Sequence, residues 1–583
     1  MNRPRGNAGS EPQLDIPEPV PRTPASLRRP TLQSLGRQTP DPRRKRLLVT
    51  ATLFTVAFLA IGARLIFVSL LEGNDEPRLA NARQASGLEA GRADILDRNG
   101  VLLATTIWSA SLYANPKLVI DPADAAERLS RVLPDLDPEW LSRRLTSDRS
   151  FVWIRRKLTP RQQYEINRLG IPGLEFIREQ RRVYPHGPLA AHVLGYTNID
   201  NRGIAGIEKS FDDILRGYPE PLRLSIDIRL QHIVHEELAA AVAGFRAIGG
   251  CAVVLDVASG EIISLVSLPD FDPDTPAAAE PESRFNRATL GIYELGSIFK
   301  LFTVAMALDA GVVGLDEGYD ATRPLRVARF TITDYHAKSR WLTVPEILIF
   351  SSNIGAAKMA RDVGGGKQRA YLDRLGMLRP ASIELPEVGA PLFPARWREI
   401  NTLTIGYGHG IAVSPLQLAL GAAALVNGGI LRPPTLLEQD PQAVGPGERV
   451  LEASTSAHMR ALMRLVVERG TGRQARVPGY WIGGKTGTAE KPDDTGRYQS
   501  DVRLSSFVAA LPIEAPRYVL MVMVDEPKGN AETHGYATGG WVAAPVVARI
   551  VERMAPLVGI VPIGPGRPAP KGDPLITAQL RGG

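Results

Sequence analysis

Apolar residues gather most densely at residues 47–71, a run of 25 residues with a single charge, Arg64. At about 1.5 Å per residue, a helix of this length crosses the roughly 30 Å hydrocarbon core of a bilayer. The basic cluster Arg43–Arg46 abuts the run, and acidic residues follow it. By the positive-inside rule, this pattern predicts one transmembrane helix with a cytoplasmic N-terminus and the rest of the chain outside. Because 46 residues precede the run, we interpret it as an uncleaved anchor and not as a signal peptide.

From residue 72 to residue 220 the apolar pattern is weak and changes its period several times. Apolar and polar residues alternate on both sides of Asn99-Gly100, which predicts two strands joined by a tight turn. Residues 121–170 have helical patterns that begin at Asp-Pro and Thr-Pro pairs. A strand is predicted in GLEFIREQRRVYPHG and a short helix in GIEKSFDDILRG. We therefore predict an extended α+β module over residues 72–220.

Between residues 221 and 558 the pattern becomes that of a larger α+β domain. It opens with a strand and a long amphipathic helix in LRLSIDIRLQHIVHEELAAAVAGF, and two strands around Ser259-Gly260 follow. Near its end, SSFVAALPIEAPRYVLMVMVDEP is again typical of strand, turn and strand, and a helix follows it. Because strands at both ends enclose helical patterns in the middle, we predict a central antiparallel sheet flanked by helices.

Charge and composition separate two tails from this folded part. The net charge is +7, yet residues 1–46 alone hold ten basic and four acidic residues, an excess of +6. The rest of the chain is close to neutral, so no domain is predicted to bind nucleic acid. The first 46 residues hold nine prolines and, like the Pro/Gly-rich residues 559–583, are predicted to be disordered. The one cysteine, Cys251, excludes an intramolecular disulfide and a thiolate zinc site, and is predicted to be buried on a strand.

Three short polar motifs in the larger domain carry the candidate chemistry. Ser297 and Lys300 begin the apolar helix pattern YELGSIFKLFTVAMALDAG; taken alone, they could be a helix cap and a solvated lysine. The motif Ser351-Ser352-Asn353 begins 54 residues after Ser297, ahead of another helix pattern. The motif Lys485-Thr486-Gly487-Thr488 follows a strand-forming Tyr-Trp-Ile. Each motif is weak by itself, but their order and their placement on helix, loop and strand indicate one site.

Through S-x-x-K, S-x-N and K-T-G-T, the chain resembles the serine acyltransferases that bind penicillin. The stretches GRADILDRNG, RRVYPHGPLAAHVLGYTN, GIAGIEKSFDDIL, LSIDIRLQ and YGHGIAVSPLQLA extend the resemblance to class B penicillin-binding proteins over residues 47–555. In layout the chain is most similar to the division-specific members. The resemblance implies a β-lactamase-like transpeptidase domain at residues 221–558, a non-catalytic pedestal at residues 72–220, and no metal or organic cofactor.

The resemblance also implies a catalytic role for five residues, and elementary chemistry supports it. Ser297 is the nucleophile, and Lys300 lies on the same helix face as its base. Lysine acts as a base only when neutral, and burial, the helix dipole and the second cation Lys485 all lower its pKa. Ser351 would relay a proton to the leaving amine, and Asn353 would hold Lys300 and the substrate backbone.

Three further residues are implied to bind the substrate. Thr486 and Thr488 offer hydroxyls beside Lys485 to a terminal carboxylate. Gly487 has no side chain, so a substrate peptide could lie against this segment as an added strand. The backbone N–H groups of Ser297 and Thr488 would form the oxyanion hole, where each donor stabilises the transition state by roughly 3–4 kcal/mol.

The reaction that follows is the cross-linking of peptidoglycan stem peptides. The serine is acylated by a D-Ala-D-Ala end, the terminal D-Ala leaves, and an amine of a neighbouring stem takes the acyl group. A β-lactam imitates this end and traps the same serine. Three alternatives stay open: an elongation-specific class B transpeptidase, a β-lactam hydrolase, which needs a base to activate water, and a catalytically idle sensor or scaffold.

The implied place of action is the bacterial inner membrane at the division septum, with the catalytic domain in the periplasm. An FtsW-type glycosyltransferase and other divisome membrane proteins are the expected partners. Arg64 either snorkels to the membrane interface or pairs with an acidic group on a partner helix. His186 is interpreted as a structural residue of a linker loop, whereas His409 and His534 lie in Gly-rich segments that either line the cleft or are ordinary loops.

Overall fold

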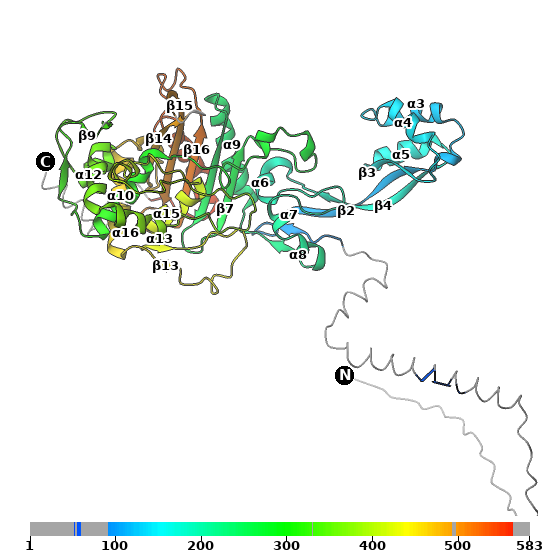
Figure 1. The fold of residues 1–583 in the computed structure, drawn as a ribbon, viewed down its shortest axis with the longest axis horizontal. Coiled ribbons are helices and arrows are strands. Elements are labelled where there is room, and N and C mark those ends of the chain that lie inside the picture. Colours follow the sequence, from blue (N-terminus) through cyan, green and yellow to red (C-terminus); the bar gives the residue numbers. More distant parts are fainter. Residues whose placement is uncertain are drawn as a thin grey trace, which may run out of the picture. The chain divides into compact units, whose positions relative to one another are not determined.

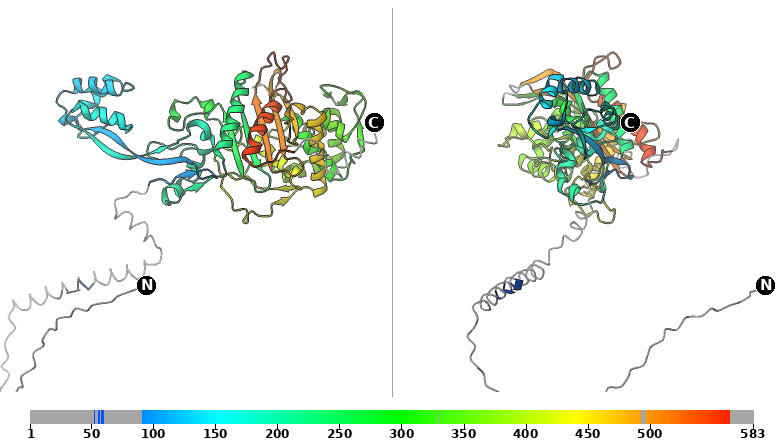
Figure 2. Two further views of the ribbon diagram at one scale, coloured as in Figure 1. Left: turned by 180° about the vertical axis from the view of Figure 1, so that it is seen from behind. Right: turned by 90° about the vertical axis from the view of Figure 1, so that its right-hand side faces the viewer.

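The computed structural model describes residues 91–563 apart from residues 329 and 493–496, together with residues 52, 55, 56, 58 and 59. The predicted N-terminal tail, most of the predicted anchor and residues 564–583 of the predicted C-terminal tail lie outside the described residues. Among the residues that are described, no helix is both long and apolar enough to span a membrane. The described residues from 91 to 563 belong to one structural unit (Figures 1 and 2).

A five-stranded antiparallel sheet lies at the centre of the larger domain (Figure 1). Its strands come from both ends of the domain, as predicted, in the order β14 (Gly483–Pro492), β15 (Tyr498–Leu511), β16 (Tyr518–Asp525), β6 (Gly249–Asp256) and β7 (Ile262–Leu268). Side chains of β6 alternate between two cores, with Ala252 and Val254 in one and Cys251 and Val253 in the other. Because both faces are covered, the strand is a continuous apolar run. Cys251 is buried on it, as predicted.

Different helices cover the two faces of this sheet. On one face, α9 (Ile228–Gly244) and α17 (Ala543–Leu557) pack against each other and share a core with the strands; Figure 2 shows them side by side in green and red. The core of the other face holds α10 (Phe299–Asp309), α15 (Pro415–Val426) and α16 (Ala453–Arg469). Every residue of α15 is buried. A helix that is apolar all round belongs in the interior of a large domain.

The remaining elements of the larger domain are short. Three two-stranded sheets pair β8 with β11, β9 with β10, and β12 with β13. The bounds are β8 (Gly318–Asp320), β9 (Leu325–Val327), β10 (Phe330–Ile332), β11 (Trp341–Thr343), α11 (Val344–Ile349), α12 (Asn353–Val363), α13 (Gly365–Arg374), α14 (Glu399–Ile405), β12 (Ile430–Leu431) and β13 (Glu448–Arg449).

The described part of the N-terminal module contains a second sheet, against which helices α3 (Pro122–Val132), α4 (Pro138–Leu145) and α5 (Pro160–Leu169) pack. Its strands follow the order β3 (Val152–Leu158), β2 (Leu102–Ala114), β1 (Ile95–Leu96) and β5 (Leu222–Arg223), and β4 (Leu174–Val183) also pairs with β2. The predicted turn between β1 and β2 is present, with Gly100 at φ +81°. Helices α3, α4 and α5 begin at the predicted Asp-Pro and Thr-Pro pairs.

One expectation for this module was wrong. The patterns of residues 121–170 predict helices, but residues 152–158 form strand β3. In VWIRRKL the residues Val152 and Ile154 are buried on one face, which is the two-residue period of a strand. The pairing of β3 with β2 decides the conformation of this short segment, because β2 offers a long partner strand.

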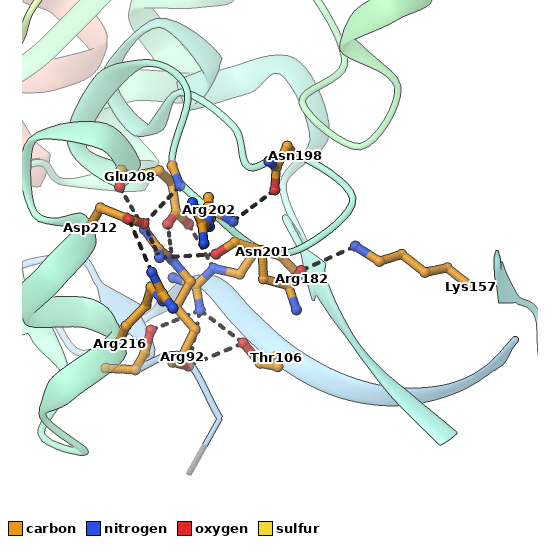
Figure 3. A network of polar contacts seen from close by, with 12 residues as sticks. Arg92, Thr106, Lys157, Arg182, Asn198, Asn201, Arg202, Glu208, Asp212 and Arg216 are labelled. Atoms are coloured by element: carbon orange, nitrogen blue, oxygen red, sulfur yellow. Dashed lines mark hydrogen bonds and ion pairs between the residues drawn. The ribbon is translucent and has the colours of Figure 1, made fainter. Parts of the chain in front are cut away.

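The short helix α6 (Ala191–Leu194) follows the β2–β4 ribbon, and a buried network of charges joins the base of the ribbon to the next two helices, α7 (Gly206–Ser210) and α8 (Asp212–Gly217). Arg92 and Arg182 converge on Glu208, and Arg92 also contacts Asp212 (Figure 3). The Arg182–Glu208 contact is 2.6 Å, and the side chain of Glu208 is fully buried. Buried charges persist only when they are paired, so this network fixes the three segments against one another.

Candidate active site

The S-x-x-K motif lies at the start of the buried helix α10. Ser297 belongs to a short 3-10 turn, Gly296–Ile298, that leads into α10, and residues 299–307 of the helix are all buried. The Nζ atom of Lys300 lies 2.9 Å from the Oγ atom of Ser297. Ser297 caps no helix, because the residue at the cap position of α10 is Ile298. Lys300 is 0 % exposed, so it is not a solvated lysine either.

The S-x-N motif brings three further oxygen atoms to Lys300. Its Nζ atom lies 2.6 Å from the carbonyl oxygen of Ser351, 3.1 Å from the Oγ atom of Ser351, and 2.7 Å from Oδ1 of Asn353. The amide nitrogen of Asn353 donates to the carbonyl oxygen of Thr333, which turns the amide oxygen toward the lysine. Ser352, between the two, caps helix α12 by accepting a bond from the N–H of Gly355. Because Ser352 caps the helix, the side chains of Ser351 and Asn353 are not used as caps and contact Lys300 instead.

Ser351 occupies a backbone conformation that few residues adopt. Its φ is +56°, in the left-handed region. A non-glycine residue held there costs on the order of 1–3 kcal/mol and persists only where the surrounding structure fixes it. In Ser351 this conformation places both the carbonyl oxygen and the hydroxyl within hydrogen-bond distance of Lys300.

The K-T-G-T motif lies on strand β14 and supplies the second lysine. Lys485 Nζ lies 3.0 Å from Ser351 Oγ, and 3.2 Å from both the carbonyl oxygen and the Oγ1 atom of Thr486. The hydroxyl of Ser351 therefore lies between two lysine amines, at 3.1 Å from Lys300 and 3.0 Å from Lys485. The structure thus brings residues from all three motifs into one connected set of contacts.

Burial controls the protonation of both lysines. Complete burial, followed by the positive charge of Lys485, holds the pKa of Lys300 well below 10.5, although Asp334 acts in the opposite direction. Burial alone lowers the pKa of Lys485 to about 7. Desolvation disfavours the ammonium form because the charge loses its hydration. Lys300 can therefore be the neutral amine that a general base must be, one turn from the hydroxyl it would deprotonate.

The substrate-binding candidates line β14, the edge strand of the sheet. The hydroxyls of Thr486 and Thr471 lie 2.7 Å apart, and the Thr488 hydroxyl accepts a bond of 3.0 Å from the N–H of Gly539. A Cβ atom on Gly487 would lie 2.2 Å from the Oγ atom of Ser506 and 2.5 Å from a backbone carbonyl oxygen. The space of the missing side chain is thus filled by the protein itself, so Gly487 is required by packing and does not leave room for substrate.

Family comparisons agree with this geometry. Residues 250–552 match the model of the penicillin binding protein transpeptidase domain, and residues 88–225 match that of the penicillin-binding protein dimerisation domain. The chain belongs to the penicillin-binding protein transpeptidase family. The resemblance to class B penicillin-binding proteins is confirmed.

Named relatives cover most of this penicillin-binding protein. It is 42 % identical over 489 residues to the probable peptidoglycan D,D-transpeptidase FtsI of Caulobacter vibrioides, covering 82 % of this chain and 83 % of that protein. It is 32 % identical to the peptidoglycan D,D-transpeptidase FtsI of Escherichia coli K12, covering 88 % and 92 %. A solved structure of penicillin-binding protein 3 from Mycobacterium tuberculosis with aztreonam has the same fold, with a TM-score of 0.65, 24 % identity, and coverage of 82 % and 98 %.

Two residues that support the site of this penicillin-binding protein were not found from the sequence. Asp334 accepts a bond of 2.7 Å from the hydroxyl of Ser352 and one of 2.9 Å from the N–H of Ile354, so it fixes the start of α12. Thr471 orients the hydroxyl of Thr486. Asp334 belongs to no motif and gave no signal, and Thr471, in the sequence Gly-Thr-Gly of residues 470–472, lies outside the three motifs.

The three histidines of the sequence analysis lie in different surroundings. His186 precedes a 3-10 turn that begins at Gly187, in the segment between β4 and α6. The ring of His534 packs edge-on against Trp541, with 5.9 Å between ring centroids. His409 lies beside the carboxylate of Glu294, with 3.4 Å between Nδ1 and Oε2. Of these three histidines, only His409 contacts a residue close to the nucleophile in sequence, because Glu294 precedes Ser297 by three residues.

Proposed function

We propose that this penicillin-binding protein is a peptidoglycan D,D-transpeptidase of the cell-division septum. The observation that carries the proposal is the pair of buried lysines that share one serine hydroxyl, with Ser297 at 2.9 Å from the first. Such an arrangement activates a serine for attack on an acyl group. The relatives named FtsI support the substrate class, which is the D-Ala-D-Ala end of stem peptides.

The first half of the reaction uses Ser297, Lys300 and Ser351. Neutral Lys300 takes the proton of the Ser297 hydroxyl as its oxygen attacks the carbonyl carbon of the donor. The proton then passes through the Ser351 hydroxyl, which touches both lysines, to the nitrogen of the departing D-Ala. The product is an ester between Ser297 and the donor peptide. Each proton transfer by a positioned group of this kind contributes about 10²- to 10⁴-fold to the rate.

Donor binding would use the edge strand β14. Among the described residues β14 pairs only with β15, so its other edge has no strand partner and would be the edge to which a peptide strand adds. Lys485, Thr486 and Thr488 would receive the terminal carboxylate. The N–H groups of Ser297 and Thr488 would stabilise the oxyanion; in support of this, a Cβ on Gly296 would lie 2.6 Å from the Thr488 carbonyl oxygen, so the two segments touch.

Labelling with a fluorescent penicillin tests the proposed acylation. We expect the purified full-length protein to be labelled covalently and the Ser297→Ala variant to show no label. Ser130→Ala, which removes an exposed hydroxyl from helix α3, is the matched control and should be labelled normally. Covalent labelling of the Ser297→Ala variant would contradict the mechanism.

The cellular part of the proposal has its own test. The sequence predicts a single-pass inner-membrane protein with a periplasmic catalytic domain, an FtsW-type glycosyltransferase as partner, a pedestal at residues 72–220 and a transpeptidase domain at residues 221–558. A fluorescent fusion should gather at mid-cell before constriction. Even distribution along the side wall would instead support the elongation-specific alternative.

A further inference from the structure

Glu294 lies at the centre of a polar cluster that acylation does not use. It precedes Ser297 by three residues. Its carboxylate accepts bonds from the hydroxyl of Tyr498, at 3.0 and 2.9 Å, and from the N–H of Gly410, at 2.9 Å. The Nδ1 atom of His409 lies 3.4 Å from the same carboxylate. Within the described part of the chain, no lysine or arginine pairs with Glu294.

The loop that carries His409 is fixed against the nucleophile's own turn. A Cβ atom on Gly408 would lie 2.0 Å from the carbonyl oxygen of Gly296, the residue before Ser297, and Gly408 has a φ of +89°. The hydroxyl of Thr303, on helix α10, donates to the carbonyl oxygen of Gly406 at 2.8 Å. The loop and the helix start therefore form one rigid rim, on which Glu294 and His409 are held at the active site and not on a free loop.

The rim is acidic and can be reached from solvent. The side chains of Glu294 and His409 are 17 % and 32 % exposed. Two phenols face them: burial, followed by the charge of Glu294, raises the pKa of Tyr407 to about 12, and burial, Glu294 and Glu490 also raise the pKa of Tyr498. Both phenols are neutral at physiological pH, so the carboxylates set the charge. A site with this character favours a cation.

We propose that Glu294 and His409 form the binding site of the acyl acceptor: the Glu294 carboxylate holds the acceptor's ammonium group and the His409 imidazole takes one of its protons. The proposal rests on the proposed function, because the second half of a transpeptidation needs an amine as nucleophile. An amine in water at neutral pH is mostly protonated and cannot attack until it loses a proton. With Nδ1 facing Glu294, the Nε2 atom of His409 is the nitrogen available to the acceptor.

The protons and bonds of this second half-reaction balance as follows. The acceptor ammonium gives one proton to Nε2 of His409, which later loses it to solvent. The neutral amine nitrogen attacks the carbonyl carbon of the Ser297 ester, and a C–N bond forms. The bond between that carbon and Ser297 Oγ then breaks, and the second proton of the nitrogen returns to Oγ through Lys300. The products are the cross-linking amide and the free serine.

The partition of the acyl-enzyme between acceptors tests the proposal. The purified full-length protein is acylated with a D-alanyl thioester donor, and its ester is released by water, by methanol or by D-alanine amide, a cationic amine. For Glu294→Gln we expect the ratio of aminolysis to hydrolysis to fall by about ten-fold or more, since a charge-assisted contact is lost. The ratio of methanolysis to hydrolysis should stay constant, because methanol carries no charge.

Two more variants make the test specific. His409→Gln should lower kcat for the amine acceptor more than it raises KM, because the variant keeps Glu294 and loses the proton acceptor. Glu387→Gln is the matched control: this half-buried carboxylate also accepts a backbone N–H, that of Gly206, but outside the site. Its aminolysis ratio should equal that of the unchanged protein.

Three outcomes would overturn the acceptor site. First, the ratio of aminolysis to hydrolysis of Glu294→Gln could equal that of the unchanged protein. Second, the rates of release by all three acceptors could fall alike, which would make Glu294 a base for any nucleophile. Labelling by penicillin could also fall as much as aminolysis in both variants, which would make the cluster a structural brace. Failure of the proposed function looks different, because the unchanged protein would then form no acyl-enzyme at all.

Discussion

Replacing Lys485 by methionine removes a buried amine that the site needs and the fold does not. The pKa of Lys485 is about 7 in the folded protein, against 10.5 as its ordinary value. A group with a lowered pKa binds fewer protons in the folded than in the unfolded state, so the free energy of unfolding rises with pH between about 7 and 10.5. Below pH 7 Lys485 is protonated in both the folded and the unfolded state. The folded protein then carries the full cost of burying the charged amine, about 5 kcal/mol at 1.36 kcal/mol for each pKa unit.

The size of the effect follows from that pKa. Between pH 6 and pH 9 the cost of burying Lys485 falls by about 2–3 kcal/mol. Methionine has a similar length and no charge, but it also gives up contacts to Ser351 and Thr486, worth about 1 kcal/mol each. The charge of Lys485 also lowers the pKa of Lys300, so its removal relieves the second lysine and acts in the same direction.

Thermal unfolding of the two proteins at several pH values measures this balance. We expect Lys485→Met to be more stable than the unchanged protein at pH 6, and this advantage should shrink steadily toward pH 9. Penicillin labelling of the variant should be at least about 10²-fold slower, as for other losses of transition-state stabilisation. An advantage that is constant or grows from pH 6 to pH 9 would refute the reasoning, because Lys485 would then not be the source of the pH dependence.

Two further substitutions test the buried charge network outside the site and the close packing of Gly487 inside it. Glu208→Gln leaves Arg92 and Arg182 buried beside a neutral amide; it should destabilise the protein by about 3–5 kcal/mol in thermal unfolding, and an unchanged melting temperature would contradict the role of the network. Gly487→Ala places a Cβ atom 2.2 Å from the hydroxyl oxygen of Ser506 and should abolish penicillin labelling. Removing that hydroxyl as well should not restore labelling, because a backbone carbonyl oxygen also lies 2.5 Å from the new Cβ atom. Restored labelling would show that the hydroxyl was the only obstacle.

Sequence reasoning predicted those parts of the protein that depend on local patterns. The three-residue spacing places Ser297 and Lys300 on one helix face, and the apolar run of helix α10 predicts its burial. The strands at both ends of the larger domain were also predicted, because buried strands are continuous apolar runs. What these elements share is that a few neighbouring residues decide them.

The contacts that the sequence did not predict depend on residues brought together by the tertiary fold. Asp334 reaches Ser352 and Ile354 from a separate segment, and no spacing or motif links the three. Ser352 occupies the variable position of the S-x-N motif and was given no role, yet it caps helix α12. Strand β3 was missed because its seven residues hold only about three repeats of the two-residue strand pattern. This is too few to outweigh the helical patterns on both sides.

The arrangement of the two lysines couples the charge of a bound substrate to the protonation of Lys300. Lys485 has a pKa of about 7, so it is only partly protonated in the free protein at neutral pH. A substrate carboxylate bound beside it favours the protonated form, because an opposite charge within a few ångströms raises the pKa of an amine. The positive charge of Lys485 in turn lowers the pKa of Lys300. The carboxylate therefore acts on Lys300 in two ways: its own negative charge raises the pKa of Lys300, as Asp334 does, and the fuller positive charge that it induces on Lys485 offsets this effect.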